Sequence, residues 1–384
     1  MVTGAYFPEL SGGGLQCRTL VRALKDRVRF LVFSTTLRPE LPHEDEIDGV
    51  PVYRWMIEVG RLRSKLKAAI SIAARFWRLR RQFDVVHLHG FSQKNVLFFT
   101  LGRLTGKKLV WKLTSAGADD PLSLKARSWV GFQCLARVDC AVSVSPRLSE
   151  LFRASRLPQH RLRVIPNGVD TERFLPATPA ARLALRQELG LRDDRPIILS
   201  VGFFSRDKGA DIVFDAWTRL EPARNERATL IFVGTADPAH PEVDPTMAQA
   251  IRREIRRLDA EGSVRFVDQA LEIEKYYRAA DVFVLASRRE GLPNALLEAM
   301  ASGLPSVVTA LPGITDWVVR DGENGLVFPP GDARALAERL AELLADPARR
   351  DALGTRARAT VLAQCSIDHV KDTYFDLYRS LATA

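Results

Sequence analysis

The sequence has few cysteines and no long apolar run. Only four of its 384 residues are cysteine, and no two of them form a Cys-x-x-Cys pair. They are therefore expected to be reduced thiols rather than parts of a disulfide or zinc framework. The longest apolar run, around VLFFTLG, is far too short to span a bilayer. No secretory signal opens the chain, so a cytoplasmic location is expected.

The short motifs of several nucleotide-binding and nucleic-acid-binding classes are absent as well. No G-x-x-x-x-G-K-[ST] sequence occurs, and GRLTGKK only approximates it, which argues against a P-loop NTPase. No aromatic-studded nucleic-acid motif accompanies the positive charge, so no nucleic-acid partner is expected. The composition that remains is globular, with 46% hydrophobic and 27% charged residues. The length suits two domains rather than one.

The chain is basic, with a net charge of +10 and a pI of about 9.7, which favours an anionic partner. Between Arg54 and Arg81 there are nine Lys/Arg residues and one acid, Glu58. The same stretch has apolar residues at helical spacing: Leu62, Leu66, Ala69, Ile70, Ala73, Phe76 and Trp77. Residues 54–81 are therefore expected to include an amphipathic basic helix. It either rests on an anionic membrane surface or packs on the core and presents a solvated basic face.

Short β-branched runs alternate with helical patterns from end to end. Strands are predicted at 2–7, 28–34, 50–56, 84–89, 108–114, 140–145 and 162–166, and again at 195–202, 228–234, 263–268, 281–287, 304–310 and 325–330. The first of these is short, as if clipped. Helices are predicted between the strands, for example at 209–220, 247–259 and 333–345. Such alternation is typical of parallel sheets covered by helices on both faces, so the fold class is α/β with two Rossmann-like domains.

The domain boundary is predicted in PNGVDTERFLPATPA, where a strand ends, an Asn-Gly turn follows, and a Pro/Ala/Thr-rich linker leads into a helix. The expected domains are 1–167 and 168–364. The last stretch, 365–384, has an amphipathic helical pattern and is expected to pack back on the first domain.

EGLPNALLEAMASGLPSVV contains two glutamates eight residues apart, directly after the apolar run DVFVLAS. Ligands of open α/β sheets bind beyond the carboxyl ends of the strands, where Glu290 is expected to lie. Pro293 suits a helix start, and the N–H groups of a first helical turn form an anion or hydroxyl site. Glu298 and Glu290 could each accept two hydroxyl protons of a sugar. Alternatively, Glu298 is a surface helix residue and Glu290 a helix cap.

Two features of the first half also point to a site. SGGGLQ contains Gly13 and Gly14 and partly matches G-x-G-x-x-G, which alone is weak evidence for a dinucleotide. His87 and His89 are expected on the same side of one strand end. They either bind a metal ion, for which no acidic third ligand is evident, or pack in the core or cleft, or serve an acceptor.

Four stretches together resemble the retaining, GT-B-fold glycosyltransferases of family 4, and the resemblance covers nearly the whole chain. RVIPNGVDTERF resembles the domain linker of that family, and SVGFFSRDKGADIVFDAW its phosphate loop. FVDQALEIEKYYRAADVFVLASRREGLPNALLEAMASGLPSVV contains its E-x7-E motif, and GENGLVFPPGDARALAERL follows as in the family. The resemblance implies two Rossmann-like domains that face each other across a deep cleft. No Asp-x-Asp occurs, so the metal-bound diphosphate of the other main glycosyltransferase fold is not expected.

The resemblance also implies roles in a donor site. Glu298 would accept the ribose hydroxyls, Glu290 would hold hydroxyls of the transferred sugar, and Lys208 would neutralise the departing diphosphate. The remaining donor-binding residues implied are Gly202, Val267, Gly291, Leu292, Pro293, Asn294 and Ala295.

The sequence departs from the family in two places. Phe203 stands where the family has an arginine, and Arg206 is the candidate to replace that charge. In many family members a histidine follows the strand after DVVHLH, but here Ser115 and Ala116 occupy that region. The acceptor side is assigned to Gly13, Gly14, His89 and Asp119, with Asp120 as a further candidate.

The resulting hypothesis is a retaining glycosyltransferase of the hexosyl type that uses a UDP- or GDP-linked sugar and no metal or other cofactor. The expected acceptor is a lipid-linked or polysaccharide hydroxyl in cell-surface glycan synthesis, with the protein cytoplasmic or peripheral on the inner face of the membrane. Two alternatives remain: a catalytically silent nucleotide- or glycan-binding subunit, and a non-hydrolysing sugar-nucleotide epimerase of the same fold.

Overall fold

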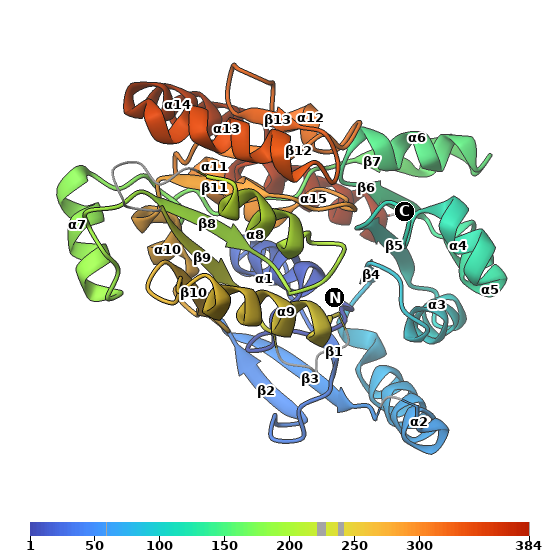
Figure 1. Cartoon of the computed structure of the whole chain (residues 1–384). Helices are drawn as coiled ribbons and strands as arrows, with labels where there is room; N and C mark the ends of the chain where they lie inside the picture. The colour runs from blue at the N-terminus through green and yellow to red at the C-terminus, as the bar shows by residue number, and fades with distance from the viewer. Residues whose placement is uncertain (59, 221–227, 237–241, 384) are drawn as a thin grey trace. The chain divides into compact units, whose positions relative to one another are not determined.

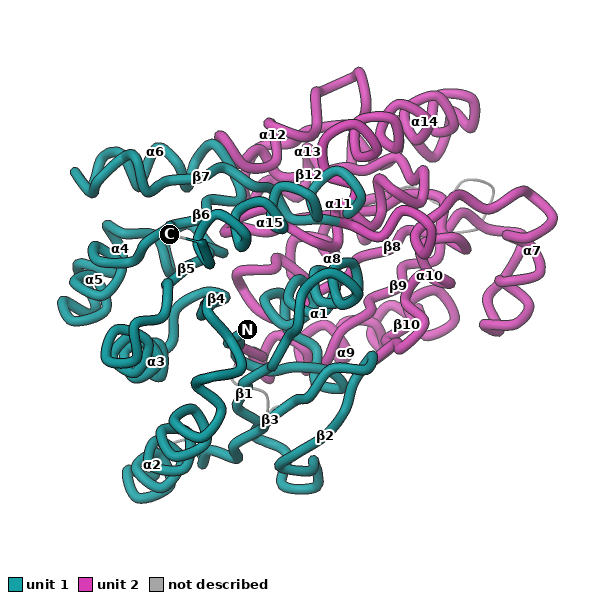
Figure 2. Tube along the Cα trace, turned by 180° about the vertical axis from the view of Figure 1, so that it is seen from behind, with its two compact units in different colours: residues 1–168, 367–384 teal, residues 169–366 magenta. Residues whose placement is uncertain are grey.

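The computed structural model describes residues 1–58, 60–220, 228–236 and 242–383. The chain divides into two compact units (Figure 2). Unit 1 comprises residues 1–168 and 367–384, and unit 2 comprises residues 169–366. Among the described residues, no helix combines the length and the apolar character needed to cross a membrane.

Unit 1 is an α/β unit whose elements are labelled in Figure 1. Its strands are β1 (Val32–Thr36), β2 (Glu44–Ile47), β3 (Val50–Met56), β4 (Val85–His89), β5 (Lys108–Leu113), β6 (Cys140–Ser143) and β7 (Leu162–Val164). Its helices are α1 (Gly12–Leu24), α2 (Leu62–Leu79), α3 (Lys94–Leu104), α4 (Pro121–Arg127), α5 (Trp129–Leu135), α6 (Pro146–Ala154) and α15 (Ile367–Ala382), with short 3-10 turns at Arg80–Gln82 and Gln159–Arg161.

The two groups of strands in unit 1, β1-β3-β2 and β4-β5-β6-β7, are joined through the first residues of the chain. Val2 forms parallel bridges to both Phe33 of β1 and Leu88 of β4. The strand predicted at 2–7 is therefore reduced to this short link, because the chain leaves the sheet at Gly4 to form the loop before α1.

Strand β2 was not predicted from the sequence. It pairs antiparallel with β3 through a tight turn at Asp48 and Gly49, whose φ angles of 55° and 79° suit a type I′ hairpin. The strand is mostly acidic and exposed, so it lacks the hydrophobic alternation on which the prediction rested.

Helices cover both faces of the unit 1 sheet. On one face α1 and α15 pack together over a core that includes Val32, Val52, Val110 and Val142. On the other face Phe76 of α2 and Phe98 of α3 contact Phe33. The C-terminal helix α15 thus completes the first half of the chain rather than the second.

Unit 2 has a single sheet of parallel strands. Its strands are β8 (Ile197–Val201), β9 (Thr229–Val233), β10 (Val264–Val267), β11 (Val282–Leu285), β12 (Ser306–Thr309) and β13 (Leu326–Phe328). Its helices are α7 (Pro179–Glu188), α8 (Ala210–Thr218), α9 (Pro245–Arg257), α10 (Ile273–Ala279), α11 (Asn294–Ala301), α12 (Thr315–Val318), α13 (Ala333–Ala345) and α14 (Pro347–Gln364).

The strand order of unit 2 is β10-β9-β8-β11-β12-β13, which is the 3-2-1-4-5-6 order of a Rossmann fold. Most side chains of these strands are buried on both faces, as expected for a parallel sheet between helices, and the edge strand β10 is partly exposed. The order reverses between β8 and β11, whose residues pair in parallel register. In such sheets the ligand site lies beyond the carboxyl ends of these two strands.

Unit 1 has the same arrangement. With the Val2 link counted as the first strand, the order of its parallel strands is β3, β1, link, β4, β5, β6 and β7. The reversal therefore lies between the link and β4. Each unit has one such switch point, and the two positions are where candidate sites are expected.

Candidate functional site

The switch point of unit 2 brings Lys208 and Glu290 into direct contact. Lys208 lies in the loop after β8 and Glu290 in the loop after β11, 82 positions apart in sequence. The Lys208 Nζ donates a hydrogen bond of 2.7 Å to a carboxylate oxygen of Glu290. Two residues that were predicted to act on one ligand are thus neighbours in the folded unit.

The backbones of these two loops touch, and glycine makes the contact possible. Gly209 has φ of +69°, and a Cβ atom there would lie 2.2 Å from the carbonyl oxygen of Ala286. The Arg288 N–H donates to the Asp207 carbonyl at 2.8 Å, and the Arg288 guanidinium pairs with Asp211 at 2.9 Å. The Lys208 and Glu290 backbones are therefore held by contacts that do not involve the two side chains themselves.

The ion pair keeps a cation at the edge of the sheet. Burial disfavours the charged form of Lys208, but the Glu290 carboxylate outweighs it and raises the pKa of the lysine above its usual value. The ammonium is therefore fully charged near neutral pH. The Glu290 side chain is only 9% exposed, whereas that of Lys208 is 31% exposed. An anion from solvent can therefore approach the lysine.

Glu298 lies on α11, on the side away from the buried apolar residues. Its neighbours Leu297 and Ala299 are fully buried. The Tyr277 hydroxyl, from α10, donates a hydrogen bond of 2.9 Å to the Glu298 Oε2. Burial raises the pKa of Glu298, and the Tyr277 hydrogen bond partly opposes that shift. Glu298 is thus an oriented carboxylate rather than a freely rotating surface residue.

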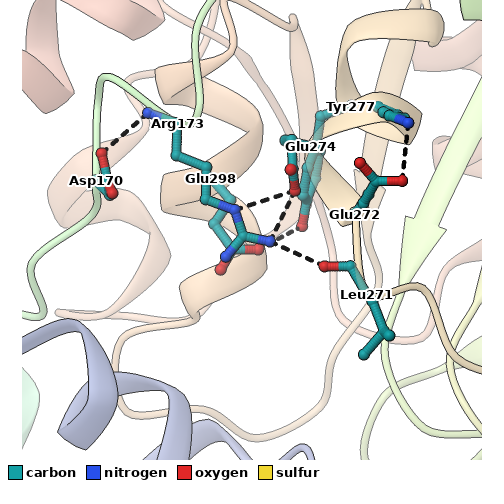
Figure 3. A network of polar contacts seen from close by, with 8 residues as sticks. Asp170, Arg173, Leu271, Glu272, Glu274, Tyr277 and Glu298 are labelled. Atoms are coloured by element: carbon teal, nitrogen blue, oxygen red, sulfur yellow. Dashed lines mark hydrogen bonds and ion pairs between the residues drawn. The ribbon is translucent and has the colours of Figure 1, made fainter. Parts of the chain in front are cut away.

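A second ionic contact lies beside this carboxylate (Figure 3). Arg173, from the linker segment that begins unit 2, donates to Glu274 of α10 at 2.7 and 3.0 Å and to the Leu271 carbonyl at 3.2 Å. Asp170 accepts from the Arg173 backbone N–H at 2.9 Å. The start of unit 2 is thereby tied to the helix that carries Tyr277.

The other predicted donor residues lie along the same edge of the sheet. Gly202 follows β8 and Val267 ends β10, and the Gly202 N–H donates to the Val233 carbonyl at 2.9 Å. The residues 291–295 form the end of the loop and the first turn of α11, with Pro293 as the cap position. Their roles toward a ligand stay predictions.

The candidate replacement for the family arginine lies apart from the ion pair. The Arg206 side chain is 82% exposed, and its guanidinium lies 3.4 Å from a carboxylate oxygen of Asp244. Phe203 is partly buried and packs against the core of unit 2. The Arg206 side chain is therefore paired with Asp244, and its contact with a ligand held by Lys208 stays a prediction.

The switch point of unit 1 is a pocket of about 290 Å³ that contains three of the predicted acceptor-side residues, Gly13, His89 and Asp119. Its hydroxyl-bearing residues are Thr3, Ser11, Ser92, Thr114 and Ser115, and Arg127 also lines it. Gly14 serves packing: a Cβ atom there would lie 2.2 Å from the Ala5 carbonyl oxygen.

The two histidine rings have centroids 4.3 Å apart and are tilted by 35°, and both side chains are buried. His87 Nδ1 is hydrogen-bonded to the Tyr378 hydroxyl of α15 at 2.7 Å, so His87 belongs to the core. His89 lines the pocket. Burial lowers the pKa of both imidazoles well below the usual value, which keeps them neutral. Among the described residues, no group of three or more His, Cys, Asp or Glu is placed to hold a metal ion.

Asp119 and Asp120 organise the loop after β5. Asp119 accepts hydrogen bonds from the backbone N–H of Thr114 and Ser115, with distances from 2.7 to 3.1 Å, and from the Thr114 hydroxyl at 2.6 Å. Asp120 caps α4 by accepting from the N–H groups of residues 122 and 123 at 3.1 Å. Both carboxylates therefore stabilise the local backbone. Contact between Asp119 and an acceptor stays a prediction.

Sequence reasoning missed Tyr277, Arg173 and Glu274. Arg173 and Glu274 are about a hundred residues apart in the sequence, so no local motif predicts their contact. Tyr277 could have been found, because it lies on the helix that immediately precedes β11 and is therefore a neighbour of α11.

Comparison with known proteins identifies the family of the chain. Residues 181–360 match the family described as glycosyl transferases group 1, and residues 11–168 match the glycosyl transferase 4-like domain. The chain is 30% identical to alpha-maltose-1-phosphate synthase of Mycolicibacterium smegmatis over 71% of this chain and 70% of that protein. It is 31% identical to the lipopolysaccharide core biosynthesis glycosyltransferase LpsE of Rhizobium meliloti, over 63% of this chain and 64% of LpsE, just under two thirds of that relative.

Among solved structures, HepE of Anabaena in complex with UDP and glucose aligns over 99% of both chains, with a TM-score of 0.80 and 19% sequence identity. The likeness shows the fold, which is the GT-B fold that the sequence predicts. The fold class is thus confirmed.

Proposed function

Because the chain belongs to the group 1 glycosyl transferases, we propose that it transfers a sugar from a nucleoside-diphosphate sugar to an acceptor hydroxyl with retention of configuration. The observation that carries the proposal is the Lys208–Glu290 pair at the switch point of unit 2, followed on α11 by the oriented carboxylate of Glu298.

Lys208 is the group proposed to receive the diphosphate. When the bond between the sugar C1 and the phosphate oxygen breaks, negative charge accumulates on the leaving group. A cation held in position before the reaction stabilises that charge without reorganisation. Lys208 has the required charge near neutral pH and the required exposure. A lysine in this position supplies charge that a metal ion would otherwise provide, so we propose transfer without a metal.

Glu298 is the group proposed to accept the two ribose hydroxyls. The Tyr277 hydroxyl holds one carboxylate oxygen and thereby fixes the plane of the group. Glu290 would accept hydroxyls of the transferred sugar, and the first turn of α11 would donate N–H groups to sugar and phosphate oxygens. A UDP-linked donor is supported by the structural likeness to HepE, which was solved with UDP. A GDP-linked donor is the alternative.

The proposed chemistry needs no protein nucleophile, and the ion pair with Lys208 makes Glu290 a poor one. The acceptor oxygen would attack C1 on the face that the diphosphate leaves. The C1–O bond to phosphate breaks, the bond to the acceptor forms, and the departing phosphate oxygen takes the acceptor proton.

The acceptor is proposed to bind at the switch point of unit 1. Its pocket is lined by five hydroxyl-bearing side chains, by the neutral His89 and by Arg127, which suits a hydroxyl-rich ligand with an anionic substituent. A lipid-linked or polysaccharide acceptor in cell-surface glycan synthesis, reached from the cytoplasmic side, is supported by the similarity to LpsE.

The test is donor turnover with UDP- and GDP-sugars. Lys208→Ala should lower transfer and donor hydrolysis by about 100- to 1000-fold. Lys275→Ala is the matched control, because Lys275 also pairs with a glutamate at 2.7 Å and is 24% exposed, but it lies on α10 facing Glu188. Equal activity of the two variants would overturn the proposed role of Lys208.

A catalytically silent nucleotide-binding subunit is the second candidate, and Phe203 favours it, because a phenylalanine supplies no charge to the leaving group. Nucleotide binding without turnover of any donor, in the presence of sugar and lipid acceptors, would support this candidate over transfer.

A further inference from the structure

Helix α2 has two apolar faces, and only one of them packs on unit 1. The buried face consists of Ala68, Ile72, Phe76 and Leu79. The interior contact is reinforced on this side by a hydrogen bond of 2.9 Å from the Trp55 indole to the Ser71 hydroxyl. The helix is therefore anchored without using its remaining apolar residues.

The second face is an exposed stripe. Its large residues are Leu62, Leu66, Ile70 and Trp77, which are 79%, 60%, 64% and 52% exposed. At about 100° per residue these side chains fall within an arc of about 80°, along a length of about 22 Å. The sequence had assigned Phe76 to the same face, but the structure places it in the core. A continuous stripe of large apolar side chains is rarely left in water.

The charge of the chain is concentrated on the same helix. Residues 61–81 contain eight Lys/Arg and no Asp or Glu, so they carry eight of the ten net positive charges of the whole chain. Six of these residues are exposed: Arg61, Arg63, Lys65, Lys67, Arg78 and Arg81. Among them, Arg63 and Lys67 lie on one flank of the stripe, by the same helical geometry.

We propose that this stripe, with its basic flank, docks unit 1 on an anionic membrane surface. The apolar side chains would enter the boundary between headgroups and acyl chains, with the lysines and arginines at the phosphates. Trp77 would sit at the interface, where its amphipathic ring is favoured. The helix would lie in the plane of the membrane rather than cross it.

The charge pattern favours an anionic membrane surface, rather than a second copy of the chain, as the binding partner of the stripe. Two α2 helices that paired through their stripes would bring two strongly basic segments together. Arg61 and Arg75 pair with Glu58 and Glu44, but residues 61–81 themselves contain no acid to compensate the other six charges. An anionic bilayer satisfies both the stripe and the charges. The proposal does not depend on the donor chemistry, since it concerns no residue of the Lys208 or Glu298 sites.

The experiment is vesicle flotation of the full chain, with phosphatidylcholine vesicles and with vesicles that contain about 30% phosphatidylglycerol. Wild-type protein should bind the anionic vesicles and release largely at about 0.5 M salt. The variants Leu66→Ser/Ile70→Ser and Lys65→Glu/Lys67→Glu should each lower the partition coefficient about tenfold or more. Leu183→Ser/Leu362→Ser is the control, because these leucines of unit 2 are also exposed, though less so, at 43% and 44%.

The proposal is overturned if wild-type protein does not bind anionic vesicles, or if the serine variant binds as well as wild type. It is also overturned if light scattering shows a dimer that the stripe variants abolish, since the occupant would then be a second copy. An unchanged melting temperature and nucleotide-induced shift for every variant verifies that the fold and the donor site are intact.

Discussion

The two units share one strand order, yet their switch points have opposite chemistry. In unit 2 the switch point is ionic: Lys208 and Glu290 meet at 2.7 Å, and Glu298 is held nearby. In unit 1 it is a pocket lined mainly by hydroxyls, glycine backbone and the neutral His89, with Asp119 and Arg127 also in its lining. Topology therefore places a candidate site in both units, and the side chains decide whether that site favours an anionic ligand or a polyol.

Lys112 of unit 1 is buried and forced toward neutrality, unlike Lys208 of unit 2. Burial lowers the pKa of Lys112 to about 7, while Glu290 raises that of Lys208. The difference follows from one partner: Lys208 has a carboxylate within hydrogen-bond distance, whereas Lys112 lies near the Tyr374 ring. A cation at a switch point is useful only where such a partner keeps it charged.

The largest expected effect comes from removing Lys208, the cation at the switch point of unit 2. Lys208→Ala should lower kcat of transfer by about 100- to 1000-fold, because the leaving diphosphate loses its positioned charge. Arg206→Ala should change kcat less than about threefold, since that side chain is exposed and paired with Asp244. Steady-state kinetics with one donor separate the two. A larger effect from Arg206 would show that it has taken over the leaving-group role.

The next prediction concerns the room for a Cβ atom at two adjacent glycines of unit 1, Gly13 and Gly14. Gly14→Ala should lower the free energy of unfolding by about 2 to 3 kcal/mol, because the new Cβ atom meets the Ala5 carbonyl oxygen. Gly13→Ala should leave stability nearly unchanged, since a Cβ there has 3.7 Å to its nearest neighbour. Urea unfolding measures both. Gly13→Ala should nevertheless raise the KM for the acceptor while leaving nucleotide binding intact. An unchanged KM would show that Gly13 does not belong to the acceptor site.

The buried lysine gives unit 1 a distinct pH dependence. The folded pKa of Lys112, about 7, lies below its ordinary value. Between the two values the unfolded chain binds a proton that the folded chain does not, so stability rises with pH above 7 and this contribution is flat below 7. Lys112→Met should raise the free energy of unfolding at pH 7 by about 1.5 kcal/mol and reduce that slope. An unchanged slope between pH 7 and 10 would contradict the assignment.

The smallest expected effect concerns Tyr277, which donates a hydrogen bond to Glu298 in unit 2. Tyr277→Phe should weaken nucleotide binding about fivefold, since one oriented hydrogen bond to Glu298 is lost. The Tyr277 hydroxyl lowers the pKa of Glu298, so its loss should move the acid limb of nucleotide binding to higher pH. Binding isotherms from pH 5 to 8 measure this shift, with Tyr276→Phe as the neighbouring control. A loss of affinity without any pH shift would mean that Tyr277 serves packing alone.

Most of the α/β framework could be predicted from the sequence, because parallel strands buried on both faces produce uninterrupted apolar runs such as DVFVLAS. The acidic edge strand β2 could not, since it has no buried face to mark it. The sequence feature that could have indicated this strand is the hairpin turn at Asp48–Gly49 rather than the strand residues themselves. The strand at 2–7 was too long, because the apolar run continues after the chain has left the sheet.

The candidate site was predictable where a motif is local and not where it depends on packing. Glu290 and Glu298 stand in one motif, and the family resemblance supplied Lys208. The contact between Lys208 and Glu290 depends on β8 and β11 being neighbours, which is a property of strand order. Asp119 shows the opposite case, since a carboxylate in a promising loop accepts four hydrogen bonds from that loop.

The measurement that tests the account most directly is a thermal-shift titration of the full chain with UDP, GDP and ADP, with and without EDTA. A ligand that binds the native state raises the melting temperature by mass action. The account predicts a shift with UDP or GDP that EDTA does not change, that Lys208→Ala and Glu298→Ala abolish, and that Lys275→Ala retains. No shift with any of the nucleotides, or a shift that survives in both site variants, would contradict a metal-free donor site at the switch point of unit 2.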